Sequence, residues 1–131
     1  MAEGGLRLLL DANVLIWLQT APARVAGAVT SAIEDLENAK FVSAATVWEI
    51  EIKRAAGRLD APPDLVDATV RAGFLELPVR FEHASALRLL PRLHGDPFDR
   101  MLIAQARVEG LTIVTADEQI ARYDVPLLRV G

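Results

Sequence analysis

Short apolar runs alternate with longer segments of helical periodicity, and this alternation limits the possible folds more than any other feature of the sequence. The first run, Leu6–Leu10, is apolar at nearly every position, as is typical of a strand buried on both faces of a parallel sheet. Further strands are expected at residues 41–43, 74–79, 111–115 and 125–130, and Pro78 indicates an edge strand at 74–79. Strands that alternate with helices form βα units. The sequence therefore predicts an α/β fold with a central, mainly parallel sheet of four to five strands and helices on both faces.

Helices are expected between these strands. Their predicted ranges are 11–18, 22–38, 44–56, 62–72, 81–90 and 116–123, with a further helix that starts at Asp96 and is ended by Gly110. The helix at 44–56 has a predicted apolar stripe made of Ala45, Trp48, Ile52, Ala55 and Ala56. Trp17 and Trp48 are both expected in the core.

Length and composition are those of one globular domain over residues 1–131. The chain is 52% hydrophobic, and no apolar run approaches the roughly 20 residues that cross a bilayer. It contains no Cys and begins without the basic region of a secretory signal, so we expect a cytoplasmic protein without thiolate metal sites. The net charge of −4 argues against a protein that coats DNA, but not against an enzyme that handles nucleic acid through a metal ion.

One acid lies where a solvated side chain would not be placed. Asp96 followed by Pro97 is typical of a helix start, so Asp96 is predicted to be a structural cap. On this register Asp99 is in the first turn and shares the apolar face with Leu102, Ile103 and Ala106. The simpler interpretation is that Asp99 only stabilises the start of the helix. Its position among apolar side chains favours a function.

Three more acids follow predicted strands. Asp11 comes directly after the first strand, Glu49 lies one turn into the helix after the second, and Asp117 lies two residues after the run 111–115. Because the carboxyl ends of parallel strands meet at one edge of a sheet, we expect these acids to face a common crevice. Asp99 reaches the same edge only if the preceding connection returns the chain there, which we assume.

Each of these acids also has a purely structural interpretation. Asp11 can be the N-cap of the next helix, Glu49 can pair with Lys53, and Asp117 can belong to a capping box that begins at Thr115. Together, however, three or four carboxylates in one partly apolar crevice repel one another strongly. A hard divalent cation such as Mg²⁺ or Mn²⁺ relieves this repulsion, keeps bound waters and can turn one of them into a nucleophile.

Other kinds of site find little support in the sequence. His83 and His94 lack metal-ligand spacing and are expected to be surface or hydrogen-bonding histidines. The chain contains neither a G-x-x-x-x-G-K-[ST] nor a G-x-G-x-x-G phosphate-binding motif, and it lacks the nucleophile elbow of serine hydrolases.

Four segments together resemble the PIN domain, and more narrowly the VapC type of toxin ribonuclease from bacterial toxin–antitoxin pairs. They are LLLDANVL at 8–15, SAATVWEI at 43–50, DPFDRMLIAQA at 96–106 and VTAD at 114–117. The resemblance covers essentially the whole chain, and the segment 96–106 is its most specific part. It implies a three-layer α/β/α sandwich and a Mg²⁺- or Mn²⁺-dependent endoribonuclease, in which a metal-activated water attacks an RNA phosphodiester.

The resemblance also implies roles for particular residues. The catalytic acids would be Asp11, Glu49, Asp99 and Asp117, of which Asp117 occupies the most variable position. Asp11 and Asp99 would bind the metal directly, and Glu49 and Asp117 would complete the cluster through water or a second ion. Supporting groups would be Asn13, Thr46, Arg100 and Thr115. The family usually forms homodimers and is neutralised by a small antitoxin, and helices at 12–18 and 44–56 are candidates for these contacts.

Two alternatives stay open at this point. A receiver-like domain also gathers acids around Mg²⁺, as a phosphoryl acceptor, but it needs a Lys near the end of a late strand, and Lys40 and Lys53 both come too early. A catalytically silent PIN-like scaffold would only bind a partner, and it has no reason to keep four mutually repelling acids.

Overall fold

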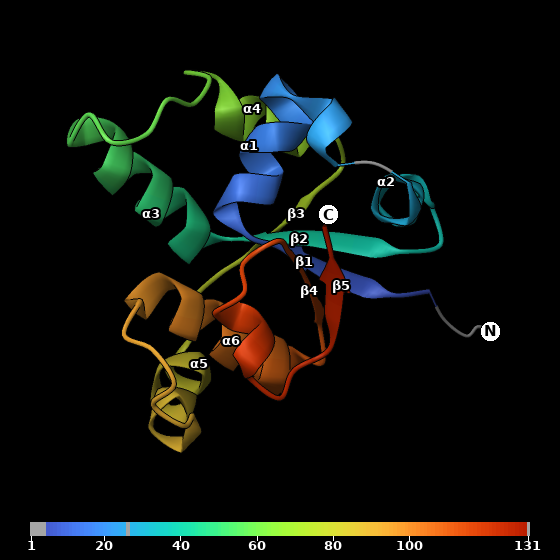
Figure 1. Cartoon of the computed structure of the whole chain (residues 1–131). Helices are drawn as coiled ribbons and strands as arrows, with labels where there is room; N and C mark the ends of the chain where they lie inside the picture. The colour runs from blue at the N-terminus through green and yellow to red at the C-terminus, as the bar shows by residue number, and fades with distance from the viewer. Residues whose placement is uncertain (1–4, 26, 131) are drawn as a thin grey trace.

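The structure is a computed structural model that describes residues 5–25 and 27–130 (Figure 1). Its strands are β1 Arg7–Leu10, β2 Ala39–Ser43, β3 Leu75–Leu77, β4 Thr112–Thr115 and β5 Leu127–Arg129. Its α-helices are α1 Ala12–Thr20, α2 Ala28–Glu34, α3 Ala44–Ala55, α4 Leu65–Arg71, α5 Phe81–Ala86 and α6 Pro97–Glu109. Short 3₁₀ turns occur at Pro22–Arg24, Leu87–Leu89 and Ile120–Arg122. Within these residues, every helix is too short or too polar to cross a membrane.

The five strands form one parallel sheet in the order β3-β2-β1-β4-β5. The central strand is β1, where Leu9 lies beside Phe41 of β2 on one side and Ile113 of β4 on the other. This confirms the predicted parallel sheet, and β3 is an edge strand, as Pro78 indicated. Receiver-like domains have the strand order 2-1-3-4-5. The observed order therefore excludes that alternative.

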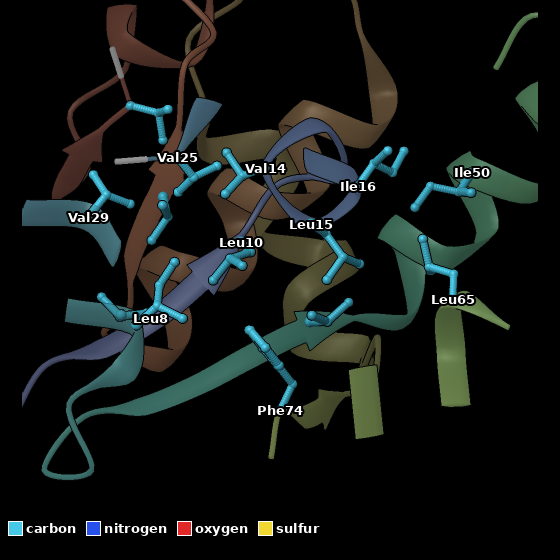
Figure 2. Packing of buried hydrophobic residues seen from close by; sticks show 14 of the residues in the cluster. Leu8, Leu10, Val14, Leu15, Ile16, Val25, Val29, Ile50, Leu65 and Phe74 are labelled. Carbon is cyan, nitrogen blue, oxygen red and sulfur yellow. The ribbon is translucent and has the colours of Figure 1, made fainter. Parts of the chain in front are cut away.

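Helices cover both faces of the sheet, as Figure 1 shows. Side chains alternate along β1, so Leu8 and Leu10 pack with residues of α1, α2 and α4, whereas Leu9 packs with α6 on the opposite face. Figure 2 shows the first of these two cores. The predicted apolar face of α6 is confirmed, since Leu102, Ile103 and Ala106 are all buried. Two apolar cores separated by one sheet make a three-layer α/β/α sandwich, as expected.

Several predicted helices are wrong in extent. The segment 22–38 is broken by Gly27, which has a φ of 68° and precedes the short α2. The segment 116–123 forms only the turn at Ile120–Arg122, because the Thr115 and Asp117 side chains accept backbone N–H groups and compete with a helix. The segments 62–72 and 81–90 are also shorter, since α4 begins at Leu65 and α5 ends at Ala86.

The predicted apolar stripe of α3 is wrong as well. Trp48 is 62% exposed and Ile52 is 43% exposed, and of the five stripe residues only Ala45 is buried. The helix instead buries Ala45, Thr46, Glu49 and Ile50. Trp48 packs edge to face against Phe98 of α6, with 5.2 Å between ring centroids, and Trp17 is only partly buried. The prediction failed because two polar residues occupy the inward face of this helix.

Candidate functional site

A small pocket at the carboxyl edge of the sheet collects acids from four separate parts of the chain. It has a volume of about 80 Å³, and we call it the acidic pocket. Its lining includes Asp11, Asn13, Glu49, Lys53, Asp96, Asp99 and Asp117. The pocket opens where β1 and β4 end, the point at which the strand order changes direction. All four predicted acids are brought together here, and the assumed return of the chain to this edge before α6 is confirmed.

Asp11 reaches the pocket directly from the end of β1. It caps α1, since the backbone N–H of Val14 donates to Asp11 Oδ1 at 2.9 Å, and the hydroxyl of Thr115 donates to Oδ2. The residue is only 6% exposed. Burial raises the pKa of Asp11, the two hydrogen bonds lower it, and the charges of Asp117 and Glu49 raise it further. The structural and functional interpretations of Asp11 are therefore compatible.

Asp99 lies in the first turn of α6, which Asp96 caps as predicted. Asp96 Oδ1 accepts the N–H groups of Phe98 and Asp99 at 2.8 and 3.1 Å. The Asp99 side chain is 13% exposed, and its Oδ2 accepts a hydrogen bond from His94 Nε2 at 3.1 Å. The pKa of Asp99 is raised to about 6, mainly by burial and in part by the neighbouring acids, while the hydrogen bond from His94 acts in the opposite direction. The ionised form of Asp99 is thus costly in the metal-free protein.

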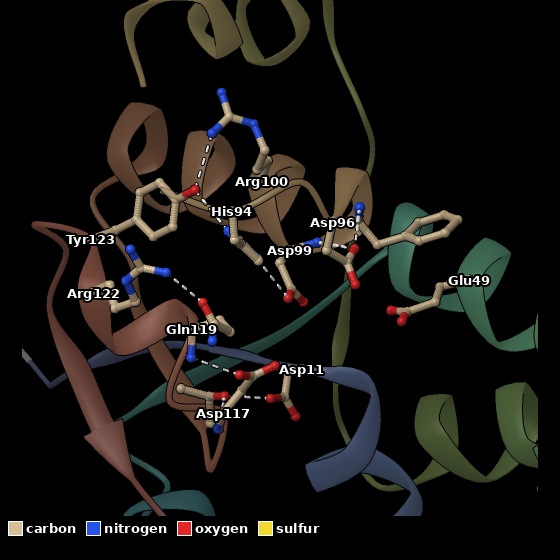
Figure 3. Close-up of polar contacts among 12 residues, drawn as sticks. Asp11, Glu49, His94, Asp96, Asp99, Arg100, Asp117, Gln119, Arg122 and Tyr123 are labelled. Atoms are coloured by element: carbon tan, nitrogen blue, oxygen red, sulfur yellow. Dashed lines mark hydrogen bonds and ion pairs between the residues drawn. The ribbon is translucent and has the colours of Figure 1, made fainter. Parts of the chain in front are cut away.

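Glu49 points into the pocket from α3, a helix capped by Ser43 at the end of β2. It is 7% exposed, and Lys53 Nζ lies 2.6 Å from its Oε2. The hydrogen bond to Glu49 raises the pKa of Lys53, although partial burial of the lysine acts in the opposite direction. The predicted structural pair therefore forms, and both of its members line the acidic pocket. Figure 3 shows Glu49 beside Asp96 and Asp99.

Asp117 is held by the turn that follows β4. Its N–H donates to Thr115 Oγ1 at 2.9 Å, and its Oδ1 accepts the N–H of Gln119 at 2.8 Å. The alternative capping box is not formed, because Glu118 pairs instead with Arg129 at 2.6 Å. Thr115 thus contacts both Asp11 and Asp117, which ties the ends of two neighbouring strands together.

The other predicted supporting residues have different positions. Asn13 lines the pocket, whereas Thr46 is buried and its hydroxyl has no hydrogen-bond partner among the described residues. Arg100 points away from the pocket; its guanidinium donates to the carbonyl of Pro91 at 2.9 Å and to the hydroxyl of Tyr123 at 3.0 Å. Arg100 therefore supports the site only through other residues.

Sequence reasoning missed a hydrogen-bond chain that ends at Asp99. Arg100 donates to Tyr123, the Tyr123 hydroxyl lies 2.8 Å from His94 Nδ1, and His94 Nε2 reaches Asp99 (Figure 3). If the tyrosine proton goes to Nδ1, then Nε2 carries the hydrogen that Asp99 accepts. His94 is a hydrogen-bonding histidine, as expected. Its position two residues before the cap of α6 was the feature of the sequence that could have placed it near Asp99.

The donor set fits a hard divalent cation. The acids offer only oxygen ligands, which Mg²⁺ and Mn²⁺ prefer, and Asp99 Oδ1 accepts no hydrogen bond from the described residues. No three acids of this pocket, among the residues placed by the structure, bring ligand atoms within 4.8 Å of one another. An ion here would therefore be held by few carboxylates and by water.

A tighter trio occurs elsewhere, where ligand atoms of Glu82, His83 and Glu109 lie within 4.8 Å of one another. It does not suit a metal ion. The backbone N–H of Arg80 donates to His83 Nδ1 at 3.0 Å, so His83 Nε2 carries a hydrogen and donates to Glu109 at 2.7 Å. Both ring nitrogens of this fully buried histidine are thus already used.

Comparison with known proteins gives one family and one fold. The chain matches the PIN domain family over residues 8–126. No curated protein matches it.

Several solved structures are similar to this one. The VapBC2 structure from Rickettsia felis, bound to a DNA fragment from its promoter, gives a TM-score of 0.74 at 12% identity, covering 96% of this chain and 100% of that chain. DNA-bound VapBC from Salmonella typhimurium gives 0.65 at 17% identity, covering 95% and 98%. FitAcB from Neisseria gonorrhoeae gives 0.61 at 20% identity, covering 93% and 96%. At these identities the likeness establishes the shared fold.

Proposed function

This chain belongs to the PIN domain family, and from that premise we propose that it is a Mg²⁺- or Mn²⁺-dependent endoribonuclease, the toxin of a toxin–antitoxin pair. The observation that carries the proposal is the acidic pocket, where Asp11, Glu49, Asp99 and Asp117 meet from distant parts of the chain. Burial and the charges of Glu49 and Asp117 raise the pKa of both Asp11 and Asp99, so the ionised forms of these two acids are costly unless a cation is bound.

We assign roles according to the contacts of each acid. Asp11 and Asp99 are the proposed direct ligands, because both are held in place by hydrogen bonds that leave lone pairs for an ion. Glu49 and Asp117 complete the cluster, through water or a second ion. The bound ion would supply an activated water and neutralise charge on a phosphoryl oxygen. Thr115 and His94 orient these groups, Asn13 lines the pocket beside them, and Lys53 balances Glu49.

Partners are proposed on the same basis. The similar structures are of VapBC and FitAcB, and we infer that a small antitoxin neutralises this chain. A single domain, a homodimer and a cytoplasmic location complete the proposal. An antitoxin-like reading frame immediately upstream, whose product co-purifies with this chain, would support it.

The activity is tested with Asp99→Asn and a matched control. Purified wild-type protein should cleave single-stranded RNA in Mg²⁺ or Mn²⁺ and not in EDTA, and Asp99→Asn should reduce the rate by at least about 100-fold. Asp67→Asn makes the same chemical change on the exposed side of α4 and should cleave at the wild-type rate. Wild-type activity in Asp99→Asn would refute the site. Inactive wild-type protein would favour the silent scaffold, and cleavage of DNA alone would refute the RNA assignment.

A further inference from the structure

A second hollow, which we call the basic hollow, lies beside the acidic pocket and has a volume of about 290 Å³. Its lining includes Arg88, Arg92, His94, Gly95, Pro97 and Arg100. Three arginines thus face one concavity, and none of the described residues that line it is an acid. The chain as a whole carries 18 acids against 14 bases, so this is a local reversal of the overall charge.

The arginines of the basic hollow lack acidic partners within the described part of the chain. Other arginines are paired, as Arg71 is with Asp64 at 3.6 Å and Arg129 with Glu118 at 2.6 Å. Arg88 and Arg92 are exposed and form no such pair. Arg100 donates only to neutral oxygens, those of Pro91, Leu87 and Tyr123. The positive charge of the hollow is therefore available to an anion.

The basic hollow and the acidic pocket share one wall. The loop before α6 presents His94, Gly95 and Pro97 to the basic hollow and Asp96 to the acidic pocket. His94 also bonds to Asp99 at 3.1 Å, and Figure 3 shows it between Arg100 and Asp99. The two hollows are therefore neighbours on either side of the segment 94–97.

We propose that the basic hollow binds a backbone phosphate of the RNA, next to the phosphate that is cleaved in the acidic pocket. This inference rests on the proposed function. RNA carries a charge on every nucleotide, so a strand with one phosphate at the acids places others nearby, where Asp96 and Asp99 repel them. Unpaired arginines offset this repulsion, and their planar guanidinium groups bind phosphate oxygens in pairs.

The test uses Arg88→Gln combined with Arg92→Gln, two exposed positions whose change should leave the fold intact. Binding of a fluorescein-labelled oligouridylate is followed by fluorescence anisotropy in EDTA, where no metal-dependent cleavage occurs. We expect affinity to fall about tenfold at low salt. The plot of log affinity against log salt should become less steep by about 0.7, the value for one phosphate contact on a single strand. Lysine at both positions keeps the charge but not the paired hydrogen bonds, so it should weaken binding less than glutamine does and leave the salt dependence unchanged.

The control, Arg71→Gln with Arg107→Gln, lowers the net charge by the same two units on exposed surfaces and should bind like wild type. Equal losses in both double variants, or none in either, would overturn the inference. If the variant with Arg88→Gln and Arg92→Gln bound RNA like the wild type but no longer bound labelled polyglutamate, the hollow would instead be assigned to an acidic protein segment. Because binding is measured without cleavage, an inactive wild-type protein would refute the proposed nuclease without deciding the phosphate site.

Discussion

Asp99 is the acid of the pocket whose ionisation most destabilises the metal-free protein. Burial is the main reason that its pKa rises to about 6, and the charges of Asp96, Asp117 and Glu49 add to it. An aspartate in an unfolded chain ionises near pH 4. Between about pH 4 and 6 the folded protein therefore holds more protons at this site than the unfolded chain does. It follows that stability falls as the pH rises through this range.

We predict that Asp99→Asn removes most of this fall. Without metal, the free energy of unfolding of the wild type should decrease from about pH 4 to pH 7. At pH 7 the Asn variant should be more stable by about 1 kcal/mol, because partial exposure screens part of the cost. Urea unfolding in EDTA at several pH values measures this.

The control for this comparison is Asp67→Asn, which should follow the wild type at every pH. Asp99→Asn also removes the charged partner of His94, so the difference reports Asp99 together with that contact. An Asn variant whose stability varies with pH in parallel with the wild type would contradict the prediction.

At the scale of elements, the start of α6 serves both the fold and the pocket. Asp96 accepts two backbone N–H groups of the first turn, and the same carboxylate lines the acidic pocket beside Asp99. Its hydrogen bonds stabilise the helix, whereas its charge raises the pKa of Asp99. The two effects can be separated by substitution.

We predict that Asp96→Ala lowers the stability of the protein in EDTA, whereas Asp96→Ser does not. Alanine removes the cap, which costs about 1 kcal/mol and outweighs the relief of repulsion. Serine caps helices about as well as aspartate and removes the charge, so this variant should equal or exceed the wild type in stability. Chemical denaturation of the three proteins at pH 7 is the measurement. Equal destabilisation by both substitutions would contradict the prediction, because it would mean that a neutral cap cannot replace the aspartate.

The elements that could be predicted from sequence are those whose signals are local. Residues 8–10 of β1 are all leucine because both faces of the sheet are covered there, and α6 is marked by Asp96-Pro97 at one end and by Gly110, with a φ of 70°, at the other. The segment 116–123 was mispredicted because its helical pattern competes with side-chain bonds to the backbone. The inward face of α3 was mispredicted because hydrophobic periodicity gives no weight to a buried Glu49.

The residues of the site also fall into those that could be predicted from sequence and those that could not. Acids that follow strands of a parallel sheet must share an edge, so Asp11, Glu49 and Asp117 could be grouped from sequence alone. The hydrogen-bond chain from Tyr123 through His94 to Asp99 could not be predicted in this way, because loops of irregular shape bring these residues together. Arg100 was predicted to support the site, but it lies outside the acidic pocket and lines the basic hollow.

At the scale of the whole molecule, the acidic pocket joins segments that are far apart along the chain. Asp11 follows β1, Glu49 lies on α3, Asp99 on α6, and Asp117 follows β4. The unfolded chain cannot hold these carboxylates together, so a cation bound by them binds only the folded state. Its binding energy is then added to the stability of the entire fold.

We therefore predict that Mg²⁺ or Mn²⁺ raises the melting temperature and that EDTA reverses the rise. At a free-ion concentration 100 times the dissociation constant, the gain is about 2.7 kcal/mol. Asp11→Asn and Asp99→Asn should lose most of this gain, while Asp67→Asn keeps it. KCl of matched ionic strength separates binding from general screening of the acids, since it should give a much smaller rise in all four proteins. A shift of the same size in KCl, or one that survives in Asp99→Asn, would mean that the pocket does not bind the ion.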